Sequence, residues 1–318
     1  MPDTYIVTGG AGFIGSHLVE RLLNDGHHVR VIDNFSTGTP ANLKHLVENP
    51  ALTDRLTIHE CSITDKDSIR PLFDGVRCVF HHAALPSVQV SIKDPLAVHE
   101  HCATGTLNVL VAARDAGVKR VVYAASAAAY GDVEVPSTGE TMLPDPKSPY
   151  GAAKLFGEYY CKVFTEVYGL ETVSLRYFNV FGPRQDPTSD YAAVIPIFIS
   201  RMLDGQTPII YGDGLQTRDF TYVENIVHGN LLAAESDTGV GSVLNIAMGA
   251  SINLLGLVDK LNRLLGTSYI PVHESPQPGD IKHSRAAIER ARQLISYEPI
   301  VDFDTGLART VAWYQQMG

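Results

Sequence analysis

The chain has 318 residues, of which 45% are hydrophobic and 19% are charged. This composition is that of a folded globular protein and excludes intrinsic disorder and fibrous repeats. Acidic residues outnumber basic ones by 35 to 25, which gives a net charge of −10 and argues against binding nucleic acids or anionic membranes through net charge. At this length a single core nears its practical limit, so we expect one large domain or two interleaved ones.

The N-terminal segment and the cysteine spacing indicate a cytoplasmic protein. A strand-like run at residues 5–7 begins almost at once, without the basic region and apolar core of a secretory signal. No run of about 18 apolar residues is present, so no membrane-spanning helix is expected. The four cysteines stand far apart, and the twelve histidines lack the spacing of a helical metal site. We therefore expect reduced cysteines and no metal.

The first half of the chain alternates between strand-like and helix-like segments. Ile14, Leu18 and Leu22 recur every four residues, as on one face of a helix that Gly26 ends, and residues 107–117 show a second helical pattern. The predicted strands are short apolar runs at residues 5–8, 28–33, 56–59, 78–81, 120–125 and 172–177. Strands of this kind separated by helices indicate an α/β protein with a doubly wound parallel sheet.

The second half is less regular. Its predicted elements are helices at residues 192–203, 224–234, 254–265 and 286–294 and a strand at residues 243–246. We expect residues 178–318 to form a smaller α/β domain over the carboxyl edge of the sheet, where open α/β sheets bind ligands. Residues 1–177 then form the first domain, to which the chain returns around residues 219–247.

A glycine-rich turn, Gly9-Gly10-Ala11-Gly12-Phe13-Ile14-Gly15, follows the first strand and opens the first helix. Gly9 makes the tight turn, Gly12 lets a pyrophosphate approach the helix N-terminus, and Gly15 allows close packing of helix and strand. Asp33 ends the second strand, where a carboxylate binds ribose hydroxyls and repels a 2′-phosphate. The turn alone is explained as well by tight packing, but together with Asp33 it favours NAD over NADP.

Tyr150 and Lys154 stand four residues apart, so on a helix beginning at Pro149 their side chains share one face. A nearby ammonium and the positive nicotinamide ring would favour the phenolate of Tyr150, which could then exchange a proton with a sugar hydroxyl. Ser126 follows the strand at residues 121–125, and its hydroxyl could share the same substrate oxygen. The alternatives are a surface pair for Tyr150 and Lys154 and a turn or helix cap for Ser126.

Together these motifs resemble those of the extended short-chain dehydrogenases/reductases, and within them the nucleotide-sugar 4-epimerases. The resemblance runs over nearly the whole chain and is closest to the bacterial UDP-N-acetylglucosamine 4-epimerases. The segments that carry it are residues 8–15, 33–38, 81–85, 126–131, 150–154, 176–187, 191–196, 212–214, 218–219 and 279–280. It implies a Rossmann-type sheet that binds NAD, with a smaller C-terminal cap domain that binds a UDP-sugar.

The resemblance also implies roles for single residues. Ser126, Tyr150 and Lys154 would be catalytic: Tyr150 takes the 4-hydroxyl proton as hydride passes to NAD⁺, and hydride returns to the other face of the 4-keto sugar. The cofactor-binding set would be Gly9, Gly12, Phe13, Ile14, Gly15, Asp33, Asn34, Ser36, Thr37, Gly38, Ser62, Ile63, His82, Ala83, Ala84, Cys102, Ala124, Tyr150, Lys154 and Tyr177. The substrate-binding set would be Ser87, Ser126, Asn179, Ala193, Val194, Tyr211, Arg218, Asp280 and Ser284.

Residues next to these sets indicate which reaction and sugar to expect. Ser126 is followed by three alanines where related dehydratases and decarboxylases carry an acid, which favours plain epimerisation. Ser284 is small where members restricted to unmodified hexoses carry a tyrosine, so an N-acetyl group should fit. Ser87 resembles a residue near the sugar in the N-acetylhexosamine group. The alternative is that Ser284 and Ser87 are ordinary surface residues.

On the nucleotide side, Arg218 would pair with the diphosphate, because a guanidinium matches phosphate oxygens bidentately. An ion pair with Asp219 is the alternative for Arg218. Asn179 resembles a residue on the sugar–phosphate side, and Tyr211 could line the uracil pocket. The chain departs from the family pattern at Ser62, Cys102, Gln277 and Pro86.

The helix that begins at Pro149 carries apolar residues on more than one side, namely Leu155, Phe156, Tyr159, Tyr160, Val163 and Phe164. One side would cover the sheet. The other, with the helix at residues 104–116, would form half of a four-helix homodimer interface, as the resemblance also implies. Contact with the cap domain is the alternative.

Three functions remain open at this point. The first is a UDP-N-acetylglucosamine/UDP-N-acetylgalactosamine 4-epimerase that also takes UDP-glucose and UDP-galactose. The second is a UDP-glucuronate 4-epimerase or another nucleotide-sugar epimerase or dehydratase of the family. The third is a non-catalytic NAD-binding sensor on the same fold, which would have no need of the Ser126, Tyr150 and Lys154 set.

Overall fold

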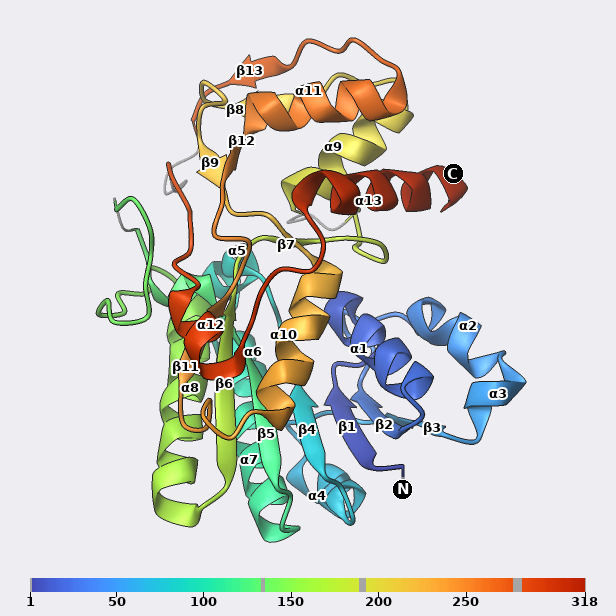
Figure 1. The fold of residues 1–318 in the computed structure, drawn as a ribbon, viewed down its shortest axis with the longest axis vertical. Coiled ribbons are helices and arrows are strands. Elements are labelled where there is room, and N and C mark those ends of the chain that lie inside the picture. The colour runs from blue at the N-terminus through green and yellow to red at the C-terminus, as the bar shows by residue number, and fades with distance from the viewer. Residues whose placement is uncertain (1, 133–134, 189–192, 277–281, 318) are drawn as a thin grey trace.

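Seven parallel strands form the central sheet, in the order β11-β6-β5-β4-β1-β2-β3 (Figure 1). The computed structural model describes residues 2–132, 135–188, 193–276 and 282–317. The strands are β1 (Thr4–Thr8), β2 (His28–Asp33), β3 (Leu56–Glu60), β4 (Cys78–His81), β5 (Arg120–Ser126), β6 (Glu171–Tyr177) and β11 (Val243–Ile246). All seven predicted strands are confirmed within one residue at each end.

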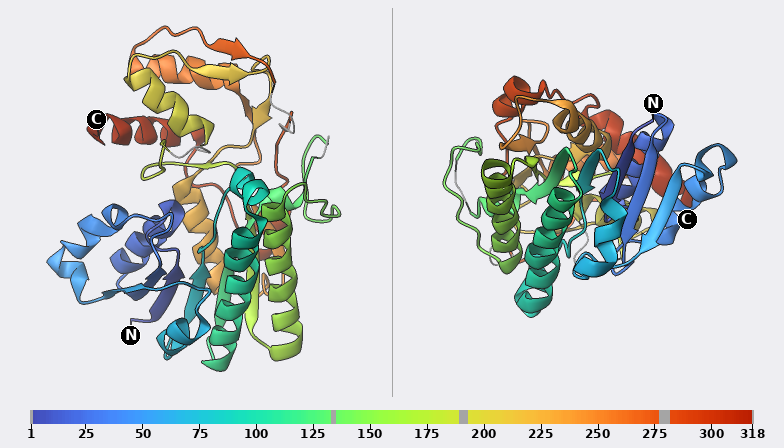
Figure 2. Two further views of the ribbon diagram at one scale, coloured as in Figure 1. Left: turned by 180° about the vertical axis from the view of Figure 1, so that it is seen from behind. Right: turned by 90° about the horizontal axis from the view of Figure 1, so that it is seen from below.

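Helices cover both faces of this sheet. One core lies between the sheet and helices α1 (Phe13–Asn24) and α10 (Val223–Glu235). A second core lies on the other face, under α7 (Gly105–Asp115) and α8 (Pro149–Tyr168), which run side by side (Figure 2). This two-sided cover is the doubly wound, Rossmann-type arrangement that the sequence predicted.

Short helices connect these elements. Along the chain they are η1 (Pro40–Leu43), α2 (Lys44–Val47), α3 (Pro50–Thr53), α4 (Lys66–Ile69), η2 (Arg70–Phe73), α5 (Val88–Lys93), α6 (Pro95–His99), the π-helical η3 (Glu100–Thr104) and η4 (Ala127–Ala129).

A smaller unit stands over the carboxyl edge of the sheet, at the top of Figure 1. Its core lies among α9 (Val194–Leu203), α11 (Leu254–Leu265) and α13 (Phe303–Met317). Its strands pair in three two-stranded sheets: β7 (Val180–Phe181) with β10 (Thr221–Tyr222), β9 (Thr217–Arg218) with β12 (Ile252–Asn253), and β8 (Ile209–Tyr211) with β13 (Val272–Glu274). No helix in the described part of the chain is long and apolar enough to cross a membrane.

The chain returns to the sheet after entering this smaller unit. Helix α10 packs against α1, and β11 pairs with β6 at the sheet edge. Helix α12 (Glu289–Ile295) follows, three residues after the start predicted for it at residue 286, and it packs against β11. The side chains of Ala286 and Ile288 are nevertheless buried in the core that lies between the sheet and helices α1 and α10, although the backbone there is not yet helical. Apolar spacing indicated burial here but not where the helix begins.

Candidate active site

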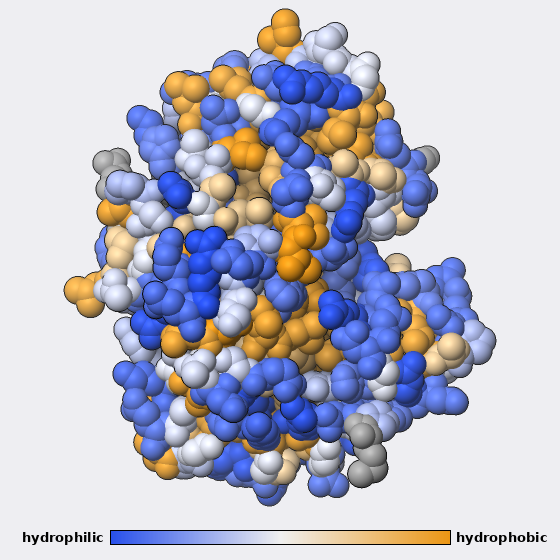
Figure 3. Space-filling view, in the orientation of Figure 1, coloured by the Kyte–Doolittle hydropathy of each residue, from blue (hydrophilic) through white to orange (hydrophobic). Residues whose placement is uncertain are grey.

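The predicted site residues that the structure describes gather where the strands end, between the sheet and the smaller unit. Figure 3 shows a notch in the surface where these two parts meet. Parallel strands all present their carboxyl ends to this edge, so residues far apart in sequence come together there.

The glycine turn after β1 is held by close backbone contacts. Gly9 has a φ of +69°, and a Cβ at Gly15 would lie 2.1 Å from the carbonyl oxygen of Gly9. Gly12 is the N-cap of α1 and has no side-chain cap. The first turn of α1 therefore keeps backbone N–H groups and a positive dipole end for an anion.

Asp33 connects this turn to the end of β2. Its side chain is 7% exposed, and its two carboxylate oxygens accept the N–H groups of Ala11 and Phe35, each at 2.9 Å. The carboxylate keeps free lone pairs, so a ribose diol could also donate to it. Asn34, Ser36 and Thr37 are exposed beside it, and Gly38 packs against the carboxylate.

Two of the expected cofactor-binding residues, Ser62 and Ile63, follow β3. The Ser62 hydroxyl is engaged locally with Thr64, at 2.8 Å between the hydroxyl oxygens. Ile63 is buried and packs against Gly105 of α7, and its carbonyl accepts a hydrogen bond from the Asn108 side chain. Sequence reasoning missed Asn108, because nothing in its neighbours along the chain marks it.

The segment after β4 is held from below by two buried side chains. The Thr8 hydroxyl lies 2.7 Å from Nδ1 of His81 and accepts the N–H groups of His82 and Ala83. The ring of His82 stacks on Tyr177 at 5.9 Å, and burial lowers the pKa of His82 to about 3. Its Nε2 is buried without a hydrogen-bond partner among the described residues. The imidazole is therefore held neutral beneath the carboxyl edge, against Tyr177.

Tyr150 and Lys154 lie in the first two turns of helix α8, at the carboxyl edge of the sheet. The Ser148 hydroxyl caps the helix by accepting the N–H of Gly151, and Pro149 takes the first position, as predicted. A Cβ at Gly151 would lie 2.6 Å from the carbonyl oxygen of Ala128, which lies in the turn directly after Ser126. Only glycine allows this approach, so Gly151 brings Tyr150 against Ser126, a role that sequence reasoning missed.

Lys154 is 3% exposed and donates to the carbonyl oxygen of Ala124 at 2.9 Å. Burial lowers the pKa of Lys154, whose Nζ lies 6.0 Å from the centre of the Tyr150 ring. Burial raises the pKa of Tyr150 above its ordinary value, and the Cys102 thiol adds to this, while a hydrogen bond with Ser126 lowers it. In the chain without its cofactor, burial is thus the largest influence on the pKa of Tyr150.

Ser126 caps the turn that follows it and also contacts Tyr150. Its hydroxyl accepts the N–H of Ala128 and so caps η4, and it also hydrogen-bonds Tyr150. Cys102 lies in the π-helical turn η3 and packs with Ala84 and Tyr150 in a small apolar cluster. The thiol fills space beside the phenol.

Behind the catalytic helix, Glu158 and Arg176 form a buried ion pair in which two guanidinium nitrogens donate to the carboxylate, at 2.8 and 2.6 Å. Their side chains are 2% and 3% exposed. The pair joins α8 to β6 one turn beyond Lys154 and fixes the register of the helix against the strand. Sequence reasoning did not find it, because its two halves lie 18 positions apart.

The expected substrate residues lie on several segments around the smaller unit. Ser87 caps α5 through the N–H of Val90. Asn179 has a φ of +32° and donates to the backbone carbonyl of Asp219. The others are Ala193 and Val194 at the start of α9, Tyr211 at the end of β8, Arg218 in β9 and Ser284 beside Thr217. Asp280 and Gln277 lie outside the described residues.

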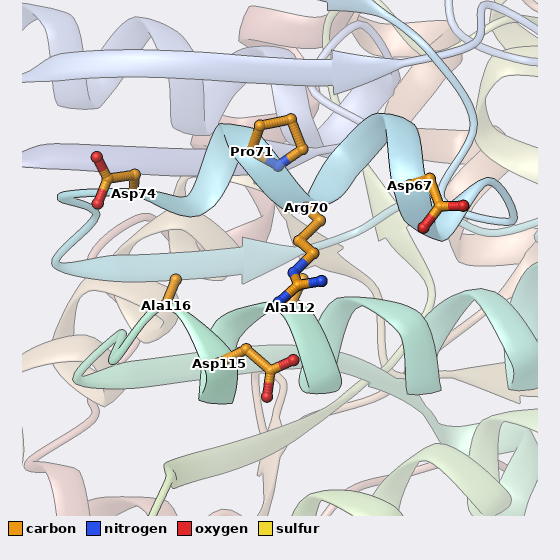
Figure 4. Close-up of a pocket in the computed structure, with 7 residues that line it drawn as sticks. All are labelled: Asp67, Arg70, Pro71, Asp74, Ala112, Asp115 and Ala116. Atoms are coloured by element: carbon orange, nitrogen blue, oxygen red, sulfur yellow. The ribbon is translucent and has the colours of Figure 1, made fainter.

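A separate pocket of about 490 Å³ lies between η2 and the C-terminal end of α7, with Arg70 extending toward α7 (Figure 4). Asp67, Asp74 and Asp115 also line it. It opens at the amino edge of the sheet, away from the residues described above, and it takes no part in the candidate active site.

Comparison with known proteins agrees with this geometry. Residues 5–247 match the NAD dependent epimerase/dehydratase family, so the chain belongs to that family. It is 36% identical over 312 residues to the UDP-glucose 4-epimerase of Mycolicibacterium smegmatis, covering 98% of each chain.

Two solved structures extend the comparison. The UDP-N-acetylglucosamine 4-epimerase of Methanobrevibacter ruminantium, in complex with UDP-N-acetylmuramic acid, is 42% identical, with all of both chains covered and a TM-score of 0.93. The UDP-glucuronic acid 4-epimerase of Bacillus cereus, with UDP-glucuronic acid and NAD, is 33% identical, with coverage of 99% and 100% and a TM-score of 0.89.

The chain is thus an NAD-dependent enzyme of the nucleotide-sugar epimerase class. The residues present fit NAD: the uncapped start of α1 suits a pyrophosphate, and the Asp33 carboxylate suits a ribose diol.

Proposed function

We propose that the chain inverts C4 of UDP-N-acetylglucosamine and UDP-N-acetylgalactosamine, and takes UDP-glucose and UDP-galactose in the same pocket. The observation that carries the proposal is the convergence of Ser126, Tyr150 and Lys154 at the carboxyl edge of the sheet. Tyr150 hydrogen-bonds Ser126, and Lys154 is anchored to the Ala124 carbonyl one turn further along α8.

In this proposal the phenol of Tyr150 exchanges a proton with the sugar 4-hydroxyl, and Ser126 shares that oxygen. When bound, NAD supplies a reversible hydride acceptor and, in its oxidised form, a positive charge. Lys154 holds the ribose side of the cofactor and keeps a cation close to the phenol. Ala127–Ala129 follow Ser126 and bring no acid to the sugar, so elimination and decarboxylation have no acid from this turn.

The preference for an N-acetylated sugar rests on Ser284. Its N–H donates to the carbonyl of Thr217, next to Arg218, so this small side chain lies beside the residue proposed to bind the diphosphate. The likeness to a UDP-N-acetylglucosamine 4-epimerase at 42% identity supports the same choice. A small side chain admits a larger sugar without excluding glucose.

The test is to incubate the purified protein and NAD with UDP-N-acetylglucosamine, UDP-glucose or UDP-glucuronate, and to separate the epimers. We expect conversion of the first and slower conversion of the second. Conversion of UDP-glucuronate alone would support the alternative substrate, and no conversion of any would refute the epimerase proposal. Tyr150→Phe should lower turnover at least about 100-fold with NAD affinity retained, whereas Tyr168→Phe on the same helix should not.

We further propose that the chain is a homodimer through α7 and α8. The outer face of α8 exposes Phe156, Tyr159, Val163 and Val167, which are 38%, 57%, 44% and 65% exposed. Apolar rows of this kind on a helix indicate burial against a partner. A monomeric mass in sedimentation at micromolar concentration would contradict the proposal.

A further inference from the structure

Asp219 is a fully buried carboxylate in the turn between β9 and β10. It binds three backbone N–H groups from two other segments. Oδ1 accepts the N–H of Met248 at 2.9 Å, and Oδ2 accepts those of Gly249 and Ala286 at 3.0 and 3.1 Å. The sequence suggested for Asp219 only an ion pair with its neighbour Arg218. The structure instead uses its carboxylate to join three parts of the chain.

Three residues of the proposed substrate site lie on or contact this arrangement. Arg218 precedes Asp219 directly. Asn179 donates from Nδ2 to the Asp219 carbonyl at 3.2 Å. Ser284 stands two residues before Ala286, and its N–H donates to the Thr217 carbonyl at 3.1 Å. The carboxylate and backbone of Asp219 therefore fix three candidate substrate contacts relative to one another.

The same network reaches the catalytic side. The N–H of Thr138 donates to the Arg285 carbonyl at 2.8 Å, and its own carbonyl accepts from the Asn245 side chain at 2.9 Å. Oδ1 of Asn245 accepts the Tyr130 hydroxyl at 2.7 Å. Tyr130 directly follows η4, the turn capped by Ser126. This series of hydrogen bonds thus runs from the Asp219 region to Tyr130, next to the turn that the proposed catalytic Ser126 caps.

We propose that Asp219 is a positioning residue for the UDP-sugar, which holds Arg218, Asn179 and Ser284 in one arrangement against the catalytic edge. This inference rests on the proposed function. A buried carboxylate that accepts three N–H groups supplies strong, charge-assisted hydrogen bonds, whereas an asparagine keeps one acceptor oxygen and turns an NH₂ donor toward at least one of the same N–H groups. The isosteric Asp219→Asn change should therefore loosen the three segments without creating a cavity.

The test measures binding of UDP and of NAD to the full-length protein by titration calorimetry. Asp219→Asn should weaken UDP binding by about tenfold or more, a change of about 1.4 kcal/mol, and leave NAD affinity within about twofold. It should raise the KM for the UDP-sugar more than it lowers kcat. The control is Glu171→Gln, which breaks the ion pair with Arg120 at the opposite sheet edge. It should lower stability without changing UDP affinity.

A double-mutant cycle separates positioning from general destabilisation. If Asp219 acts through Arg218, then Arg218→Ala should cost less UDP affinity in the Asp219→Asn background than in the wild type. Additive losses, or wild-type UDP affinity in a folded Asp219→Asn protein, would overturn the inference. Failure of the wild-type protein both to bind UDP and to convert any UDP-sugar would refute the proposed function, and this inference with it.

If Asp219→Asn cannot be recovered folded, hydrogen exchange on the wild type takes its place. UDP binding should slow exchange of the Met248, Gly249 and Ala286 amides, which donate to Asp219, because ordering Arg218 also orders its neighbours. Unchanged exchange at all three amides on saturation with UDP would overturn the inference.

Discussion

Replacing Gly151 by alanine adds a single methyl group, which should lower the rate of catalysis much more than the stability of the fold. It is the third residue of α8, and a Cβ there would lie 2.6 Å from the Ala128 carbonyl oxygen and 3.1 Å from the Cβ of Pro146. Ordinary contact begins at 3.4 Å, so in Gly151→Ala the start of the helix must retreat from η4 by about 0.8 Å. Tyr150 and Ser126 lie on the two sides of this contact and would move apart.

The effect on stability is expected to be small. Overpacking costs about 1–3 kcal/mol, but replacing glycine by alanine in a helix returns about 1 kcal/mol. The effect on turnover is expected to be large, because a misplacement of about 1 Å can lower a rate about 100-fold. We therefore expect kcat for UDP-sugar epimerisation to fall about 30- to 100-fold, while the unfolding free energy changes by less than about 2 kcal/mol.

The matched control is Gly256→Ala. Gly256 also occupies the third position of its helix, α11, and donates its N–H to the side chain of the capping residue, Asn253. Among the described residues, its added Cβ would meet only that side-chain oxygen, at 3.0 Å, and the side chain of Ile252. Steady-state kinetics and urea unfolding of both variants form the assay. Wild-type kcat in a folded Gly151→Ala protein would refute the reasoning that this contact sets the Tyr150–Ser126 geometry.

Three further changes probe the cofactor, the sugar and the fold. Asp33→Asn should raise the dissociation constant for NAD roughly 10- to 100-fold, because hydrogen bonds to a charged group contribute about 1.5–3 kcal/mol; calorimetry showing unchanged affinity would separate Asp33 from the ribose. Ser284→Tyr should lower kcat/KM for UDP-N-acetylglucosamine about tenfold more than for UDP-glucose, and equal losses would remove Ser284 from the choice of sugar. Burial lowers the pKa of His17 to about 4, so the unfolded chain takes up a proton there first as the pH falls. Stability should drop by about 2 kcal/mol on this account between pH 7.5 and 5. His17→Gln should lessen that drop in urea unfolding, and an identical drop in both proteins would contradict the assignment.

Patterns among residues close in sequence predicted most of the fold and part of the candidate site. The seven strands are short apolar runs between turn residues, and the sequence placed each of them because such patterns depend on near neighbours. The glycine turn and Asp33 were found for the same reason, since their spacing follows from one strand, one turn and one helix. The start of α8 at Pro149 was likewise visible, because proline favours the first position of a helix.

The remaining features depend on contacts between residues that are distant in sequence. Gly151 needs the Ala128 carbonyl, Asn108 needs the loop after β3, and Glu158 needs Arg176 on β6. No local pattern marks these residues, since each is defined by its partner. The register between α8 and the sheet is therefore a tertiary property.

The sequence by itself determined the class of fold, the cofactor and the chemical types of the proposed catalytic groups, because these depend on composition, residue spacing and turn residues. Only the tertiary structure decided their electrostatic state. Burial raises the pKa of Tyr150, and this desolvation depends on everything packed around the phenol. The structure also gave Asp219 its three N–H partners, since only folding brings residues 248, 249 and 286 to one carboxylate.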